Sequence, residues 1–119
     1  NGAILMSSSI LINITRPPTA DCEALEYALA MAAFDIDVKI LFSGRGIDWL
    51  NAGQASRKPG GKSPAKLLAA LPMYGIGDIA VVGGPALSDE NPKTFDACQT
   101  ISQQEAANWA RGAHHVVSF

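Results

Sequence analysis

Short apolar runs, each bounded by glycine, proline or polar residues, recur along this chain of 119 residues. Runs of this length that are rich in valine and isoleucine predict β-strands. They span Ser9–Thr15, Asp37–Phe42, Asp78–Val82, Thr94–Ile101, which is the weakest, and His114–Phe119. Because the runs show little apolar–polar alternation, we expect a sheet that is covered on both faces, as parallel sheets are.

Helix-type patterns fill the segments between these runs. The first helix is predicted over Ala20–Phe34, where apolar residues recur on one face and Thr19 or Asp21 is in position to cap the start. Further helices are predicted over Ile47–Ala52, over Ala65–Leu71 behind a capping Ser63 and a first-turn Pro64, and from a capping box of Ser102 and Glu105 to Arg111.

Strands that alternate with helices predict an α/β fold with a mainly parallel sheet. The length suits one domain, which we place at residues 9–119, with residues 1–8 as a disordered N-terminal segment or a remnant of expression. Ligands bind such sheets where the strands end at their carboxyl edge. The residues that we expect to line a site there are Arg16, Ser43, Arg45, Gly83 and Gly84.

Charged residues make up only 17 % of the chain, against about 25 % in ordinary globular domains. So few charges favour burial of part of the surface against other chains, with an Ala- and Gly-rich monomer surface as the alternative. A net charge of −2 gives no basic footprint for direct nucleic-acid binding. No apolar run has the length of a membrane span, and the first residues lack the basic region of a secretory signal, so we expect a cytoplasmic protein.

The two cysteines, Cys22 and Cys98, form no CxxC pair and suit free thiols in a reducing compartment. Cys22 is predicted in the first turn of the first helix, where backbone amides favour a thiolate, but the flanking Asp21 and Glu23 oppose it. We therefore favour a packed, unreactive thiol over a reactive one. Cys98 is expected inside the fourth strand, where it would pack in the core.

Other motifs give no catalytic constellation. Gly61-Lys62-Ser63 is similar to the end of a phosphate-binding P-loop, but Ser56 stands where that motif needs a glycine. The adjacent His114 and His115 point to opposite faces of a strand, so they cannot hold one metal together, and we expect one of them to pack inward. No cluster has metal-ligand spacing, and we expect neither a metal nor a cofactor.

Several stretches, in the same order over nearly the whole chain, resemble the TusC/DsrF branch of the DsrE/DsrF-like sulfur-relay proteins. They are Thr15–Pro18 with Glu23–Ala30, Ile40–Phe42 with Gly46 and Trp49-Leu50, Leu67–Asp78, and the terminal His115–Phe119. The order of the stretches and the matched length carry the resemblance, since no single motif is unique to the family.

The resemblance implies a three-layer α/β/α sandwich with a five-stranded, mainly parallel sheet. It also implies a hexamer of three different subunits in two copies each, the partners being homologous TusB/TusD- or DsrE/DsrH-like chains. Such complexes pass persulfide sulfur between cysteines, indirectly toward a TusE/DsrC-like acceptor. The sulfur serves tRNA 2-thiouridine synthesis in one branch and cytoplasmic sulfur oxidation in the other.

The resemblance places the main acceptor cysteine of the family in the TusD/DsrE-type subunit, near the loop after the third strand. The matching stretch here, Val82–Leu87, has glycines and no thiol, and Cys22 falls where the family usually has arginine. We therefore expect a subunit that lacks the acceptor cysteine. Two alternatives stay open: a stand-alone, homo-oligomeric sulfur carrier that uses Cys22, and a small ligand-binding α/β module.

Overall fold

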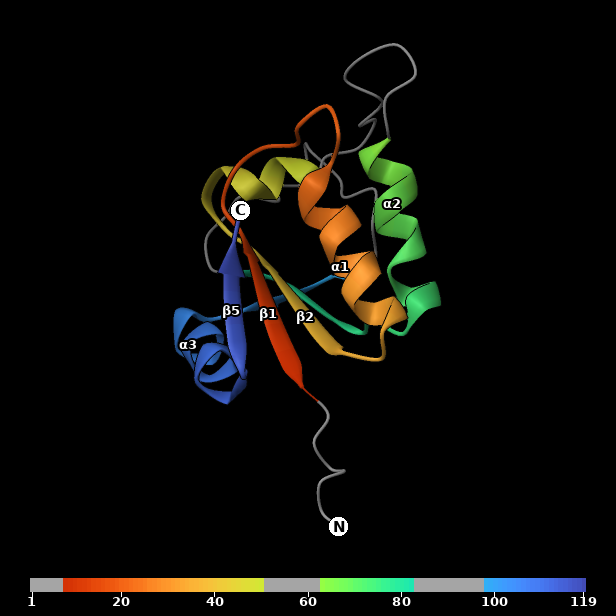
Figure 1. The fold of residues 1–119 in the computed structure, drawn as a ribbon. Helices are drawn as coiled ribbons and strands as arrows, with labels where there is room; N and C mark the ends of the chain where they lie inside the picture. Colours follow the sequence, from red (N-terminus) through yellow and green to blue (C-terminus); the bar gives the residue numbers. More distant parts are fainter. Residues whose placement is uncertain (1–7, 51–62, 83–97) are drawn as a thin grey trace.

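The computed structural model describes residues 8–50, 63–82 and 98–119 (Figure 1). All strand pairings in it are parallel, and the strands form one five-stranded sheet in the order β4-β3-β2-β1-β5. The strands are β1 (Ser9–Ile14), β2 (Asp37–Phe42), β3 (Asp78–Val82), β4 (Gln99–Ile101) and β5 (His115–Ser118). The predicted α/β class and the bounds of the second and third strands are confirmed.

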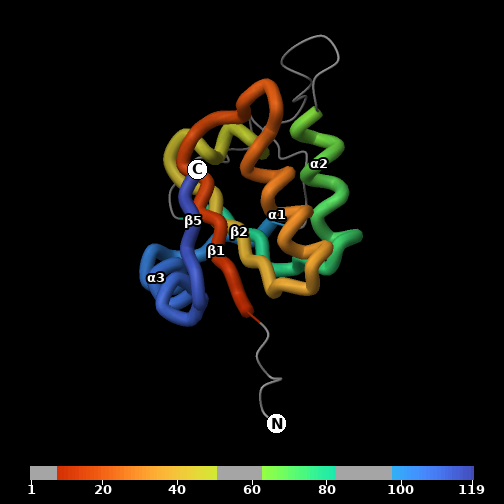
Figure 2. The backbone as a smooth tube through the Cα atoms, in the orientation of Figure 1, coloured from red at the N-terminus to blue at the C-terminus, as the bar shows by residue number. Residues whose placement is uncertain are grey.

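Helices cover both faces of this sheet, which gives the three layers that the resemblance implied (Figures 1 and 2). On one face lie α1 (Glu23–Ala33) and α2 (Pro64–Ala70), followed by the short 3-10 helix η3 (Pro72–Tyr74). On the other face lies α3 (Gln103–Gly112). A second 3-10 helix, η2 (Gly44–Leu50), follows β2 at the carboxyl edge of the sheet.

The first helix begins three residues later than predicted, at Glu23, and neither predicted residue caps it. Cys22 is the N-cap residue, with a left-handed backbone (φ 52°, ψ 44°) and no side-chain cap. The left-handed backbone at Cys22 cannot be part of a right-handed helix, so the helix can begin only after this residue. A turn precedes it, in which the Cys22 amide donates to the Thr19 carbonyl at 3.2 Å.

The two predicted serine caps are present. Ser63 Oγ accepts a hydrogen bond from the Lys66 amide at 3.4 Å at the start of α2, and Ser102 Oγ accepts one from the Glu105 amide at 3.1 Å at the start of α3. These bonds satisfy amide donors that the first turn of a helix leaves without a partner. Sequence-local chemistry therefore fixes where both helices begin.

The short helix predicted over Ile47–Ala52 is, in the residues that the structure describes, the 3-10 helix η2, which begins earlier, at Gly44. Gly44 has φ 55°, a conformation that glycine adopts without a steric penalty. Gly46 lies directly against the end of β1, because a Cβ on it would stand 2.0 Å from the Ile14 carbonyl oxygen. This close approach fixes η2 on the carboxyl end of β1.

Two histidines precede or begin β5, and both are exposed, so the expectation that one packs inward is wrong. The strand lies at the edge of the sheet, where fewer side chains surround it. His114 Nδ1 accepts a hydrogen bond from the Ser9 amide at 3.0 Å, which ties the start of β5 to the start of β1. Within the described residues, no helix is long and apolar enough to cross a membrane.

Candidate functional site

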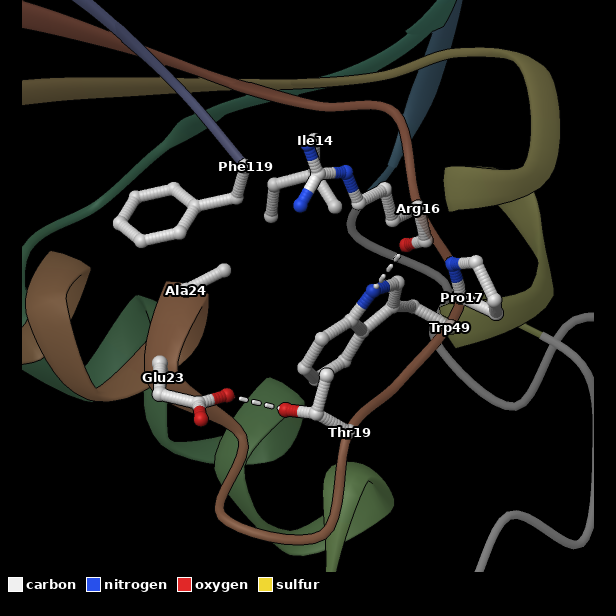
Figure 3. Close-up of a pocket in the computed structure, with 8 residues that line it drawn as sticks. All are labelled: Ile14, Arg16, Pro17, Thr19, Glu23, Ala24, Trp49 and Phe119. Atoms are coloured by element: carbon white, nitrogen blue, oxygen red, sulfur yellow. Dashed lines mark hydrogen bonds between the residues drawn. The ribbon is translucent and has the colours of Figure 1, made fainter.

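A cavity of about 300 Å³ opens at the carboxyl edge of the sheet, where β1 ends and α1 begins. Figure 3 shows the residues that line it: Ile14, Arg16, Pro17, Thr19, Glu23, Ala24, Trp49 and Phe119. Most of these side chains are apolar, and they come from β1, the following loop, α1, η2 and the end of the chain described here. The sequence analysis predicted a site at this edge and named Arg16, and Arg16 is among the residues that line this cavity.

Trp49 fixes one wall of the cavity. Its indole Nε1 donates to the Arg16 carbonyl oxygen at 2.9 Å, and only 2 % of the residue is exposed. The bond joins η2 to the loop after β1 and uses the only polar atom of the indole. The sequence analysis missed Trp49 as a site residue, although its place soon after the second strand and the Gly44–Gly46 turn put it at this edge.

Phe119 forms the opposite wall, and the backbone of β1 holds it. The Phe119 amide donates to the Asn13 carbonyl at 2.9 Å, and the Thr15 amide donates to the Phe119 carbonyl at 2.8 Å. Its ring packs against Tyr27 of α1, with 5.6 Å between the ring centroids. The wall is therefore tied to both the sheet and the helix, which leaves the ring little freedom to move.

Among the described residues that line this apolar cavity, one is a cation, Arg16, and one is an anion, Glu23. In Figure 3 the Arg16 side chain runs back from the loop, and its guanidinium is drawn beside Ile14, with the Trp49 indole below it in this view. Glu23, at the start of α1, accepts a hydrogen bond from the Thr19 hydroxyl on the far side of the cavity. Within the part of the chain that the structure describes, the Arg16 guanidinium makes no hydrogen bond or ion pair with the protein.

Cys22 lies in the turn between two lining residues, yet its side chain is not part of the cavity wall. The residue is fully buried, and Sγ contacts the Thr19 carbonyl oxygen at 3.6 Å. It precedes the helix as N-cap and does not lie in the first turn, where the sequence predicted it. Its left-handed backbone is uncommon for a residue with a side chain and carries local strain.

Cys98 is also buried, with 6 % of the residue exposed. It lies just before β4, not inside the strand as predicted, because β4 begins at Gln99. Both cysteines are free thiols and both belong to the core cluster between the sheet and α1. The expectation of packed, unbridged thiols is confirmed.

Both the sequence and the fold of this chain match those of known proteins. The model of the DsrE/DsrF-like family matches residues 8–119. The chain belongs to the DsrE/DsrF-like family. Among solved structures, the YchN protein of E. coli is similar in fold, with a TM-score of 0.72, 18 % identity, and coverage of 96 % of this chain and 100 % of YchN. The comparison with curated proteins gave no match.

In this DsrE/DsrF-like chain, Ser43 and Arg45, which were also predicted at the carboxyl edge, do not line the cavity. Ser43 lines a separate groove on the α3 face, and its amide donates to the Ile14 carbonyl at 3.0 Å. Arg45 is exposed on η2. Gly83 and Gly84 lie outside the described residues. Over the described ranges, no group of histidine, cysteine or carboxylate side chains could hold a metal ion.

Proposed function

We propose that this chain is a TusC/DsrF-like subunit of a sulfur-relay complex and that it carries no acceptor thiol of its own. Membership of the DsrE/DsrF-like family supports a sulfur-relay role within a complex of small subunits. The branch rests on the stretches that resemble TusC and DsrF. The observation that carries the proposal is the burial of Cys22 and Cys98, which are 0 % and 6 % exposed.

Burial matters because of the chemistry of sulfur transfer. A thiolate must reach the outer sulfur of a donor persulfide and attack it, so the acceptor has to be accessible to another protein. The sequence contains two cysteines, and both are enclosed by core side chains in the folded chain. The chain therefore contributes contact surface to a relay whose thiols lie on TusB/TusD- or DsrE/DsrH-like partners, in the cytoplasm, toward a TusE/DsrC-like acceptor.

The test is persulfide formation on the isolated, folded chain. The protein is incubated with inorganic polysulfide, trapped with an alkylating reagent and weighed intact by mass spectrometry. We expect no added sulfur on the folded protein, whereas the same chain in urea reacts at both cysteines. One persulfide per folded chain, lost in Cys22→Ser and kept in Cys98→Ser, contradicts the proposal.

That contradictory result would support the second candidate, a stand-alone sulfur carrier that uses Cys22. One observation favours it: Cys22 lies in a strained turn beside the cavity, so a small opening of that turn would expose the thiol. Alkylation of the native protein at neutral pH separates the two candidates, because a carrier labels Cys22 far faster than Cys98. The subunit proposal expects both to label slowly, and sulfur transfer by the reconstituted complex to survive Cys98→Ser.

A further inference from the structure

We infer that the cavity between Arg16, Trp49 and Phe119 binds a small organic monoanion, with its carboxylate on Arg16 and an apolar body between the two rings. The site needs no thiol, so it holds or fails independently of the sulfur-relay role. Three features of the cavity carry the inference: its apolar walls, Arg16 as the one cation among its described lining residues, and the Glu23 carboxylate on its far side.

The walls are apolar and already fixed. Ile14 and Ala24 are buried core residues, 1 % and 3 % exposed, and they present only carbon to the cavity. The Trp49 indole nitrogen is engaged by the Arg16 carbonyl, so the ring offers its hydrocarbon surface. Pockets that bind small molecules are mostly apolar and preformed, with volumes of about 300–1,000 Å³, and this cavity lies at the small end of that range.

Arg16 supplies the polar anchor. Its guanidinium lies at the cavity and has no acceptor among the described residues, although five N–H groups are available on it. A carboxylate can accept two of these bonds side by side, and such charge-assisted pairs are stronger than neutral hydrogen bonds.

The charges favour a monoanion over a phosphate. One guanidinium neutralises one negative charge, and a second negative charge on a ligand meets no further cation among the described residues that line the cavity. The apolar walls also give no donors with which to satisfy the remaining oxygens of a phosphate. A carboxylate on a compact aromatic or branched aliphatic body satisfies both conditions.

Trp49 gives a direct readout of binding. The chain has two tryptophans, so Trp109→Phe leaves Trp49 as the only indole. We expect phenylacetate to change the Trp49 emission of this protein saturably, with half-saturation below roughly 10 mM. Arg16→Gln should weaken binding about tenfold or more, because it removes the charged partner. Arg45→Gln, an exposed arginine on the adjacent η2, is the matched control and should change binding by less than about twofold.

Two further probes test the charge. Phenethylamine has a similar aromatic body and the opposite charge, and phenyl phosphate carries close to two negative charges at neutral pH; both should bind at least about tenfold more weakly than phenylacetate. Circular dichroism checks that Arg16→Gln is folded, which an exposed site favours. The inference is overturned if phenylacetate gives no saturable response, if folded Arg16→Gln binds it as the parent does, or if phenyl phosphate binds more tightly.

Discussion

The face of the sheet beneath α1 and the face beneath α3 share the same strands but differ in how completely they are packed. On the α1 face, the alternate residues of β1 and β2 join a large cluster with α1, α2 and η2, and Ile40 and Phe42 have no exposed surface. On the α3 face, Leu11 and Leu41 join a smaller cluster, and no residue of α3 is buried. A groove lined by Leu11, Leu41 and Val116 stays open beside α3.

This difference explains why the candidate site lies where it does. The cavity at Arg16 is walled by residues that are themselves part of the larger cluster, such as Ile14, Ala24 and Trp49. Close packing holds their side chains in single conformations, which is what a preformed binding site requires. The groove beside α3 has a comparable volume of about 340 Å³, but none of its described lining residues is charged, and its helix wall consists of partly exposed residues. The α1 face therefore supplies the better defined site.

The largest effect should come from Gly46, where η2 meets β1 on the well-packed side. Gly46→Ala places a methyl group 2.0 Å from the Ile14 carbonyl oxygen, so η2 or the end of β1 must move. We expect the free energy of unfolding to fall by about 3 kcal/mol or more, because both partners are backbone and cannot rotate away. Urea unfolding of the parent and of Gly46→Ala, monitored by circular dichroism, measures this loss of stability.

Gly77→Ala is the matched control for this change. Gly77 is exposed, and nothing lies within 4 Å of the position of its added Cβ. The same substitution there should leave stability unchanged or raise it by about 0.4–1 kcal/mol, through the lower entropy of the unfolded chain. If Gly46→Ala costs no more than Gly77→Ala, η2 is not fixed on β1 and the view of a rigid α1 face fails.

Two adjacent residues of β2 allow the packing of the two faces to be compared directly. Ile40 points into the larger cluster and Leu41 into the smaller one, with 0 % and 4 % of each residue exposed. Ile40→Ala should cost about 3–5 kcal/mol, because the enclosed cavity that it leaves cannot collapse. Leu41→Ala should cost about 2–3 kcal/mol, since α3 can shift and water can enter from the adjoining groove.

The quantity to measure is the difference between Ile40→Ala and Leu41→Ala in the free energy of unfolding. Urea unfolding of both variants under the same conditions gives it. Their backbone setting is the same strand, so strand propensity largely cancels. A larger loss for Leu41→Ala than for Ile40→Ala would show that the α3 face is the tighter one and would reverse the comparison.

Local chemistry made much of the fold predictable. Apolar runs located β2 and β3 to the residue, and the serines at positions 63 and 102 located the starts of α2 and α3, because caps depend on neighbours in sequence. The start of α1 was missed, since Thr19 bonds the Glu23 side chain and not a backbone amide. Whether Thr19 bonds a side chain or a backbone amide depends on the shape of the turn after Pro17 and Pro18. A capping rule considers only residue types and does not include that shape.

The candidate site was only partly predictable, for a different reason. Arg16 could be named because it follows β1, and residues at that place in a parallel sheet reach the carboxyl edge. Trp49 and Phe119 meet it there through contacts between segments far apart in the chain, at 2.9 Å from Trp49 Nε1 to the Arg16 oxygen and through the pairing of β1 with β5. Ser43 follows the neighbouring strand, yet it faces α3, because which face a residue takes depends on the register.

The smallest expected effect concerns the polar contacts that support the thinly packed face. Lys39 Nζ lies 2.5 Å from Asp78 Oδ2, across β2 and β3, and 5.4 Å from the centre of the Trp109 ring on α3. The Lys39 and Asp78 side chains are 30 % and 48 % exposed, so solvent screens this ion pair. A double-mutant cycle with Lys39→Met and Asp78→Asn should give a coupling below about 1 kcal/mol, falling further in high salt. Trp109→Leu, which keeps an apolar contact, should remove about 0.5–1 kcal/mol of attraction to Lys39. A coupling between Lys39 and Asp78 above about 2 kcal/mol would mean that charges, and not the small apolar cluster, hold α3 on the sheet.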